Sequence, residues 1–263
     1  MLSSFPFDPV LRSQEVEKIV MHGNARKYYR FRHADFYGPN GIITADGLGC
    51  NLLCAYCWNY IKNQTPETAK SLGFLSPSDV SKKLQSLSIR HSCDKFRISG
   101  SEPFLGQAST LHISSILKSM PSDSDFLIES NGLMLGFDPA LIKHLEGLDN
   151  ILIRIAVKGS DPLTWSKITG AQGSYQGYQI KAIKALRAKG LSVSVAIMPK
   201  FVNTELLGLG FGEDYDKEDL TYYGGTKSRL IERGLIDKPP KLMPKPTCNP
   251  SAIDFWDGQG DIT

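Results

Sequence analysis

Three cysteines lie close together in the sequence, at a spacing that could hold a metal cluster. Cys50, Cys54 and Cys57 are separated by intervals of four and three residues. Thiolates are soft ligands, and iron–sulfur clusters are held by them. Because a cubane cluster has four irons, three nearby cysteines leave one iron without a protein ligand. Catalytic zinc sites keep an open coordination position of this kind, and the same reasoning applies to an iron cluster.

The triplet carries an aromatic residue, Tyr56, directly before its last cysteine. In this form it resembles the motif of the radical S-adenosylmethionine superfamily. The resemblance implies that Cys50, Cys54 and Cys57 hold a 4Fe-4S cluster, and that the amino and carboxylate groups of S-adenosylmethionine chelate its open iron. It also implies that an electron from the cluster splits the sulfonium, and that the resulting 5′-deoxyadenosyl radical abstracts hydrogen from a substrate.

A zinc site is the alternative that the residues leave open. It would be completed by Cys93, Cys248 or a histidine, in a binding module without catalysis. Cys93 and Cys248 have no partner at close spacing, so a second cluster is not expected. The five histidines are scattered without ligand spacing.

A second motif follows a predicted strand. Gly100, Ser101, Glu102 and Pro103 resemble the Gly-Gly-Glu-Pro motif of the superfamily, with Ser101 in place of the second glycine. The resemblance implies that backbone carbonyls here and the Glu102 carboxylate bind the methionine amino group. This is physically reasonable, because an ammonium needs acceptors and a glycine lets the backbone come close. The serine side chain alters the contact geometry at that point.

Further cofactor contacts are expected at the ends of later strands. The resemblance implies that Ser130 and Asn131 reach the ribose hydroxyls or the methionine carboxylate, although Asn-Gly is also a turn signal. Arg154 lies in a nearly continuous apolar strand, where an unpaired charge would be costly. It could hold the cofactor carboxylate or a substrate anion, or extend to the barrel mouth. Met198 and Tyr56 are the candidates for packing on adenine, and core packing is the alternative for Met198.

Residues 159–170 resemble the crossover after strand four in glycyl-radical-enzyme activases of the pyruvate formate-lyase activating type. This resemblance implies a protein or peptide substrate. Ala156 stands where those activases tend to carry an aspartate. The rival within the superfamily acts on a small metabolite or modified nucleoside, with residues 26–32 contacting an anion. A cytosolic one-electron donor such as flavodoxin or ferredoxin is implied in either case.

Strands and helices alternate from Gly41 onwards, which indicates parallel βαβ units. The carboxyl ends of such strands are where ligands bind, and the motifs above fall there. The resemblance implies an α/β fold, a partial (β/α)6 TIM-like barrel, although no sixth strand is readable after Met198. Strands are predicted at residues 42–45, 96–99, 126–129, 151–157 and 191–198, and helices at residues 76–89, 107–119, 139–145, 178–189 and 227–233.

The predicted core domain spans residues 41–235. Residues 1–40 form an N-terminal extension, in which Ser13 would cap a helix over residues 14–21. Residues 24–32 mix basic and aromatic side chains and are expected to form an edge segment with its arginines in solvent. Residues 236–263 are expected to form an extended, proline-rich C-terminal tail.

Composition limits the other classes of protein. A length of 263 residues suits one α/β barrel domain with short appendages. The net charge of +3 is mild, so a nucleic-acid partner is not expected. No apolar run approaches the ~20 residues that span a bilayer, and no signal peptide is evident. Five cysteines, three of them clustered, argue against a disulfide framework. We therefore expect a reducing compartment, by default the cytoplasm.

Overall fold

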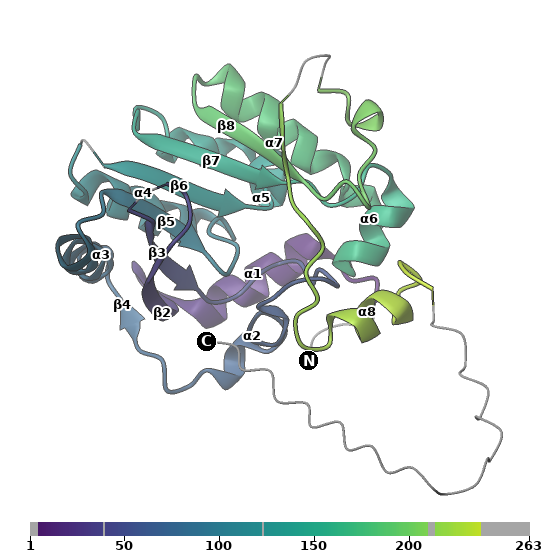
Figure 1. Cartoon of the computed structure of the whole chain (residues 1–263), viewed down its shortest axis with the longest axis horizontal. Coiled ribbons are helices and arrows are strands. Elements are labelled where there is room, and N and C mark those ends of the chain that lie inside the picture. The colour runs from purple at the N-terminus through teal and green to yellow at the C-terminus, as the bar shows by residue number, and fades with distance from the viewer. Residues whose placement is uncertain (1–4, 39, 123, 210–213, 238–263) are drawn as a thin grey trace, which may run out of the picture.

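A single sheet of nine strands organises the chain (Figure 1). The computed structural model describes residues 5–38, 40–122, 124–209 and 214–237. The strands lie in the order β1-β2-β3-β5-β6-β7-β8-β9, and β4 pairs with β2. Six of them run parallel, namely β3 (Ile42–Gly47), β5 (Lys95–Ser99), β6 (Asp125–Ser130), β7 (Ile151–Ala156), β8 (Ser192–Ile197) and β9 (Tyr215–Lys217). This unclosed, mostly parallel α/β sheet confirms the expected partial barrel.

The sixth parallel strand is short and polar. β9 pairs with β8 through Tyr215, Asp216 and Lys217, and all three side chains are at least partly exposed. Sequence patterns identify strands by apolar or alternating runs. A three-residue strand inside an acidic segment carries neither signal, which explains why it could not be read from the sequence.

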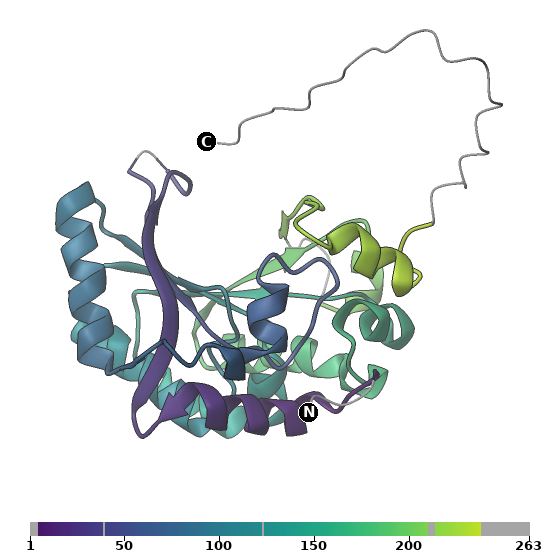
Figure 2. The ribbon, with the colours of Figure 1, turned by 90° about the horizontal axis from the view of Figure 1, so that it is seen from below.

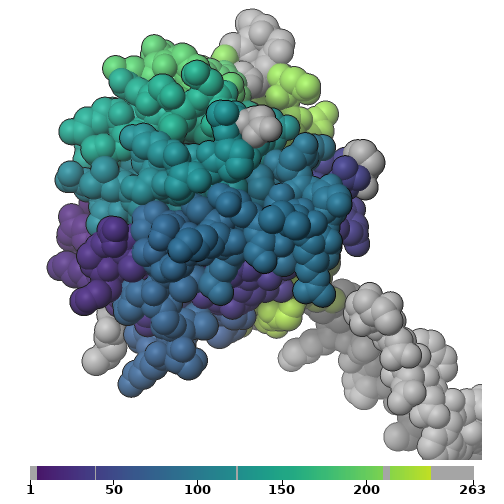
Figure 3. All heavy atoms as spheres, turned by 90° about the vertical axis from the view of Figure 1, so that its left-hand side faces the viewer, coloured from purple at the N-terminus to yellow at the C-terminus, as the bar shows by residue number. Residues whose placement is uncertain are grey.

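The helices after the parallel strands cover the outer face of the sheet. Ile98, Ile128, Ile153 and Val195 face them from neighbouring strands and are almost completely buried. Figure 3 shows the side bearing α3, where blue and teal atoms form a continuous surface. The helices are α3 (Pro77–His91), α4 (Gln107–Ser119), α5 (Leu133–Phe137), α6 (Pro162–Thr169) and α7 (Gly177–Ala188).

One predicted helix has a different form. The sequence predicts an α-helix at residues 139–145, and Asp138 before it accepts a hydrogen bond from Ala140 N at 3.2 Å. The segment is the 3-10 helix η2 (Pro139–His144), preceded by the short α5. The shorter 3-10 elements are η1 (Pro66–Thr68), η3 (Gly173–Tyr175) and η4 (Thr204–Leu207).

The N-terminal segment is built into the fold (Figure 2). Its helix α1 (Pro9–Val20) begins earlier than predicted, because Asp8 caps it by accepting from Val10 N and proline suits the first helical position. The prediction that Ser13 caps this helix is wrong. Ser13 lies inside α1 and donates to Leu105 O at 2.7 Å.

The basic and aromatic stretch forms β2 (Ala25–Ala34), which pairs antiparallel with β1 (Met21–His22), β3 and β4 (Phe74–Leu75). The expectation that its arginines lie in solvent is wrong for Arg26, which is 1% exposed. The reason is its contacts with the loop after β5, which are described below.

The remaining helices are α2 (Tyr60–Gln64) and α8 (Thr226–Glu232). Among the described residues, no helix is both long enough and apolar enough to cross a membrane. Cys93 is buried and its thiol contacts Gly41 O at 3.3 Å. Cys248 and nearly all of the predicted tail, residues 238–263, lie outside the described residues.

Gly136 tests the packing of α5 against α7. A Cβ at this position would clash with the carbonyl oxygen of Tyr178 and lie 2.8 Å from its carbonyl carbon. Gly136→Ala should therefore lower the free energy of unfolding by about 1–3 kcal/mol, measured by urea denaturation. Gly177→Ala is the matched control, since no atom lies within 4 Å of its Cβ position. Equal losses in the two variants would contradict this account.

Candidate active site

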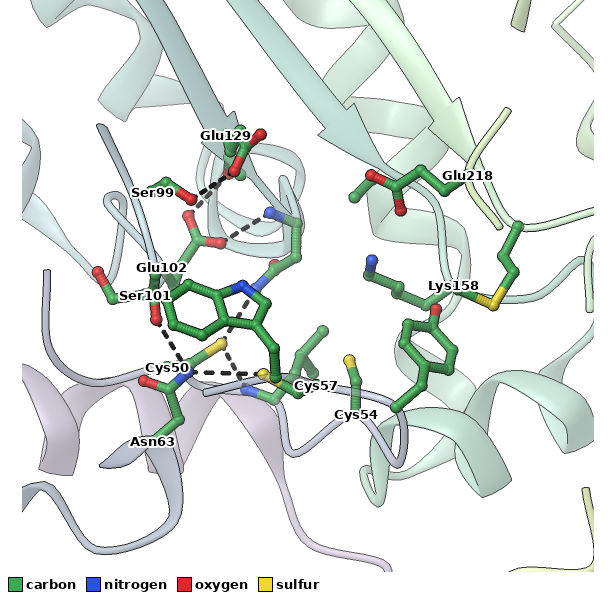
Figure 4. A pocket seen from close by; sticks show the side chains of 18 of the residues that line it. Cys50, Cys54, Cys57, Asn63, Ser99, Ser101, Glu102, Glu129, Lys158 and Glu218 are labelled. Atoms are coloured by element: carbon green, nitrogen blue, oxygen red, sulfur yellow. Dashed lines mark hydrogen bonds between the residues drawn. The ribbon is translucent and has the colours of Figure 1, made fainter. Parts of the chain in front are cut away.

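A cavity of about 470 Å³ opens at the carboxyl ends of the parallel strands. Its wall includes every residue that the sequence predicted as a metal or cofactor ligand, although these come from the segment after β3 and from four other strand ends. They are Cys50, Cys54, Tyr56, Cys57, Gly100, Ser101, Glu102, Ser130, Asn131, Arg154 and Met198. Figure 4 shows the three sulfur atoms along the lower side of the cavity, with Ser101 and Glu102 on one flank and Lys158 and Glu218 on the other.

The cysteine loop, residues 50–58, has almost no regular structure and is largely buried. Its backbone groups therefore need partners elsewhere. Leu53 N donates to Thr169 O at 2.9 Å and Ala55 N donates to Ile168 O at 2.8 Å, both at the end of α6.

Arginines from both ends of the chain bind the carbonyl groups of this loop. Arg12 of α1 donates to Cys50 O at 3.2 Å. Arg229 of α8 donates to Ala55 O at 2.9 Å, and Arg233 donates to Leu53 O at 2.8 Å. The elements that position the cysteines thus include segments far from the loop in sequence.

Cys54 is buried, Cys50 and Cys57 are partly buried, and side-chain amides lie near the sulfur atoms of Cys50 and Cys57. Burial raises the pKa of Cys54 to about 11 and raises the pKa of Cys50 and Cys57. Asn131 Nδ2 lies 3.8 Å from Cys50 Sγ, and Asn63 Nδ2 lies 3.9 Å from Cys57 Sγ. Free thiolates are disfavoured here, so a bound metal centre would supply the positive charge that stabilises them.

The chemistry of this donor set, three soft thiolates, suits a cluster that keeps an open position. Within the described part of the chain, no three His, Cys, Asp or Glu side chains are grouped as the ligands of a single metal ion. Of the other cysteines, only Cys93 falls within the described residues, and it contacts Gly41 rather than the cavity.

Glu102 joins the loops after β5 and β6. Its carboxylate accepts from Ser130 Oγ at 2.7 Å, from Asn131 N at 2.7 Å and from Phe104 N at 3.0 Å. The side chain is 2% exposed, and burial raises its pKa to about 7 although these hydrogen bonds favour the charged form. A cationic group in the cavity would restore the ionised carboxylate.

The backbone conformation at position 100 requires a glycine. Its φ of +78° is in the left-handed region, and a Cβ would lie 3.1 Å from Asp46 Cβ. Its carbonyl oxygen accepts from Asn59 Nδ2 at 2.6 Å and from Asn63 Nδ2 at 3.1 Å. Two amides of the segment after the cysteines thereby fix the loop that follows β5.

Ser101 replaces the second glycine of the superfamily motif, and its hydroxyl makes a hydrogen bond that a glycine could not make. Its hydroxyl accepts from Arg26 Nη2 at 3.3 Å and occupies the space that a Cβ on Gly47 would need. Arg26 also donates to Glu102 O at 2.6 Å and to Pro103 O at 2.8 Å. The serine therefore adds a contact with the buried arginine of β2.

Arg154 is surrounded by carboxylates. It pairs with Asp216, with Glu218 at 2.7 Å and with Glu129 at 3.8 Å. Its side chain is 9% exposed, compared with 46%, 35% and 25% for those three partners. Burial would lower the pKa of Arg154, but Asp216 and Glu218 outweigh it and raise the pKa. An anion bound at Arg154, as the sequence suggested, has to compete with these three carboxylates.

Another part of the wall is partly apolar. Tyr56 stacks on Phe201, with ring centroids 5.8 Å apart and planes 4° apart, and Met198 also lines the cavity. The ammonium of Lys158 lies 5.4 Å from the Tyr56 ring centroid. Burial alone would lower the pKa of Lys158, but the neighbouring acidic groups, Tyr56 first, raise it.

Sequence reasoning missed several residues of the cavity wall. Lys158 directly follows the predicted fourth strand, so its position at a strand end was a usable signal. Glu129 lies inside β6 next to Ser130, and a polar residue in an apolar strand was a further signal. Glu218 follows the unreadable β9, so no pattern marked it.

Strand-end loops and a thiol triplet in one shared cavity make up a candidate cofactor site in an α/β fold. Comparison with known families identifies it further, because the model of the radical SAM superfamily matches residues 46–205, more than half of the chain. The chain belongs to this superfamily, whose members use a 4Fe-4S cluster and S-adenosylmethionine.

A solved structure described as native anSMEcpe with bound AdoMet is similar at 15% identity and a TM-score of 0.40. The similarity covers 57% of this chain and 41% of that one. The chain thus spans less than half the length of this relative. The comparison with curated proteins gave no match.

The buried carboxyl of Glu102 makes stability depend on pH in the cluster-free protein. Its pKa is about 7 in the folded state and 4.5 as the ordinary value. The folded state therefore binds the proton more tightly, and the stabilisation is lost as the pH rises through 7. Between pH 5 and 8 the free energy of unfolding should fall by about 2–3 kcal/mol more than in Glu102→Gln. Chemical denaturation at several pH values measures this difference, and parallel pH profiles would contradict it.

Proposed function

We propose that this chain is a radical S-adenosylmethionine enzyme whose cluster ligands are Cys50, Cys54 and Cys57. The single observation that carries the proposal is the shared cavity, which brings the thiol triplet together with the ends of the following strands. When bound, the cluster and its cofactor supply reductive cleavage of the sulfonium and hydrogen abstraction. The protein supplies binding, orientation and exclusion of water.

The methionine end of the cofactor is assigned to the loop after β5. Glu102 offers a buried carboxylate, and the loop is fixed by Arg26 and by the two amides on Gly100 O. Ser130 and Asn131 stand at the next strand end and are assigned to the ribose or carboxylate. Their hydrogen bonds to Glu102 orient these groups together.

Adenine is assigned to the wall formed by Tyr56 and Met198. Arg154 is assigned to the side of the cavity away from the cysteine loop, where it is paired with carboxylates of β6 and of the β9 region. A substrate approaching from there meets carboxylates that are more exposed than the arginine beneath them. A cationic group is therefore better matched to this side than an anion.

The substrate that we propose is a protein or peptide, as in activases. A second hollow of about 680 Å³ runs along the inner face of the sheet and shares Arg154 with the first. Together with the unclosed sheet, it offers room for a segment larger than a small metabolite. A small metabolite or nucleoside is the alternative within the superfamily, and a zinc-binding module is the alternative outside it. The electron donor we propose is flavodoxin or ferredoxin, and the compartment is the cytoplasm.

Anaerobic reconstitution with iron and sulfide tests the enzyme class. The wild-type protein should become brown, take up about four irons per chain and release 5′-deoxyadenosine on reduction with S-adenosylmethionine. The triple variant Cys50→Ala, Cys54→Ala, Cys57→Ala should lose all three properties. Cys93→Ser is the matched control, because this buried thiol lies outside the cavity. Zinc content without iron uptake or cofactor cleavage would contradict the proposal.

A deuterium-transfer experiment separates the substrate classes. Fully deuterated cell extract is divided by size into a protein fraction and a small-molecule fraction, and each is added to the reduced enzyme. If a protein is the substrate, deuterium should enter 5′-deoxyadenosine only with the protein fraction, as measured by mass spectrometry. Transfer from the small-molecule fraction alone would instead support a metabolite.

A further inference from the structure

Arg12 is a buried cation without a carboxylate partner. Its side chain lies on α1, is 2% exposed, and has no carboxylate oxygen within 4.0 Å among the described residues. Its Nη1 atom is buried without a hydrogen-bond partner. Arg30 and Arg154, by contrast, each pair with an aspartate. A buried charge of this kind is costly unless something nearby carries the opposite charge.

The guanidinium is directed at the cysteine loop. Arg12 Nε donates to Cys50 O at 3.2 Å, and Nη2 donates to Asn63 O at 2.6 Å. It thereby joins the first cysteine to the segment whose amide reaches the Cys57 sulfur.

A cluster held by this loop would carry the missing charge. Three thiolates around an oxidised 4Fe-4S core give one net negative charge, and one-electron reduction gives two. A cation fixed beside the loop and shielded from water attracts the reduced form more strongly than the oxidised form. Net charge near a cluster is one of the properties that set its reduction potential.

We propose that Arg12 is a positioning residue that acts as the counter-ion of the cluster and raises its reduction potential. This inference rests on the proposed function, in which Cys50, Cys54 and Cys57 hold the cluster. Arg12 precedes residues 46–205, which match the superfamily. The N-terminal extension thus supplies part of the electrostatic environment of the metal centre.

Two substitutions separate charge from hydrogen bonding. Arg12→Lys keeps the positive charge but loses the planar donor group, and Arg12→Gln keeps an amide donor but loses the charge. After reconstitution, the midpoint potential of the cluster is measured by a redox titration followed by electron paramagnetic resonance. It should fall in Arg12→Gln and stay near the wild-type value in Arg12→Lys. Each tenfold loss of preference for the reduced form corresponds to 59 mV.

Arg233→Gln is the matched control. Arg233 binds Leu53 O and Ile168 O, each at 2.8 Å, but it is only partly buried, so solvent screens its charge. This variant should lower the melting temperature of the cluster-free protein with a smaller change in potential than Arg12→Gln.

The outcomes distinguish failure of the proposed function from failure of the role proposed for Arg12. If the wild-type protein takes up no iron, the proposed function fails. If Arg12→Gln holds a cluster with the wild-type potential, the function stands and the role of Arg12 is overturned. If Arg12→Gln cannot hold iron, retention by Arg12→Lys supports the charge role. Loss of iron in both variants, with equally lowered melting temperatures, would show a purely structural arginine and overturn the proposal.

Discussion

The backbone of the cysteine loop sets the main constraint on this structure. This loop is irregular and largely buried. Its carbonyl groups therefore have no hydrogen-bond partners within a helix or a sheet and need partners elsewhere. The chain meets this need with guanidinium groups from α1, from α8 and from the residue that follows α8, and with backbone hydrogen bonds to the end of α6. Arginine suits the task because its five donors lie in a fixed plane and can serve several carbonyls at once.

The same logic applies to the loop after β5. Arg26 of β2 binds two carbonyls of this loop and the hydroxyl of Ser101, while Glu102 accepts from the loop after β6. The cavity wall is therefore a set of cross-linked loops on a rigid sheet. Precise placement of polar groups on such a scaffold is what a cofactor site requires.

Much of this arrangement could be predicted from the sequence, for identifiable reasons. The five apolar strands were readable because each is buried along the outer face, and the strand-end rule placed Gly100, Glu102 and Asn131 on one side of the sheet. β9 was not readable, since three polar residues carry no periodic signal. The partners of Arg26 and Arg154 were not readable either, because long-range pairing of charges leaves no pattern in a single sequence. The buried position of Arg26 contradicted the expectation for an edge segment.

On the inner face of the sheet, positively charged side chains are buried and negatively charged side chains lie above them, closer to solvent. Arg97 and Arg154 lie against the strands with side chains 7% and 9% exposed, and Glu129 contacts both of them from a more exposed position. The cations thus neutralise the wall, and the carboxylates define the potential that an incoming molecule meets.

The hydrogen bonds between the α8 region and the cysteine loop have a consequence for biosynthesis. Arg229 and Arg233 follow the cysteine loop by more than 170 residues, as the separations of 174 and 180 positions from their carbonyl partners show. During translation the thiols leave the ribosome long before the arginines that complete their surroundings. Assembly of the proposed cluster at these thiols is therefore expected as a late event, after α8 has left the ribosomal tunnel.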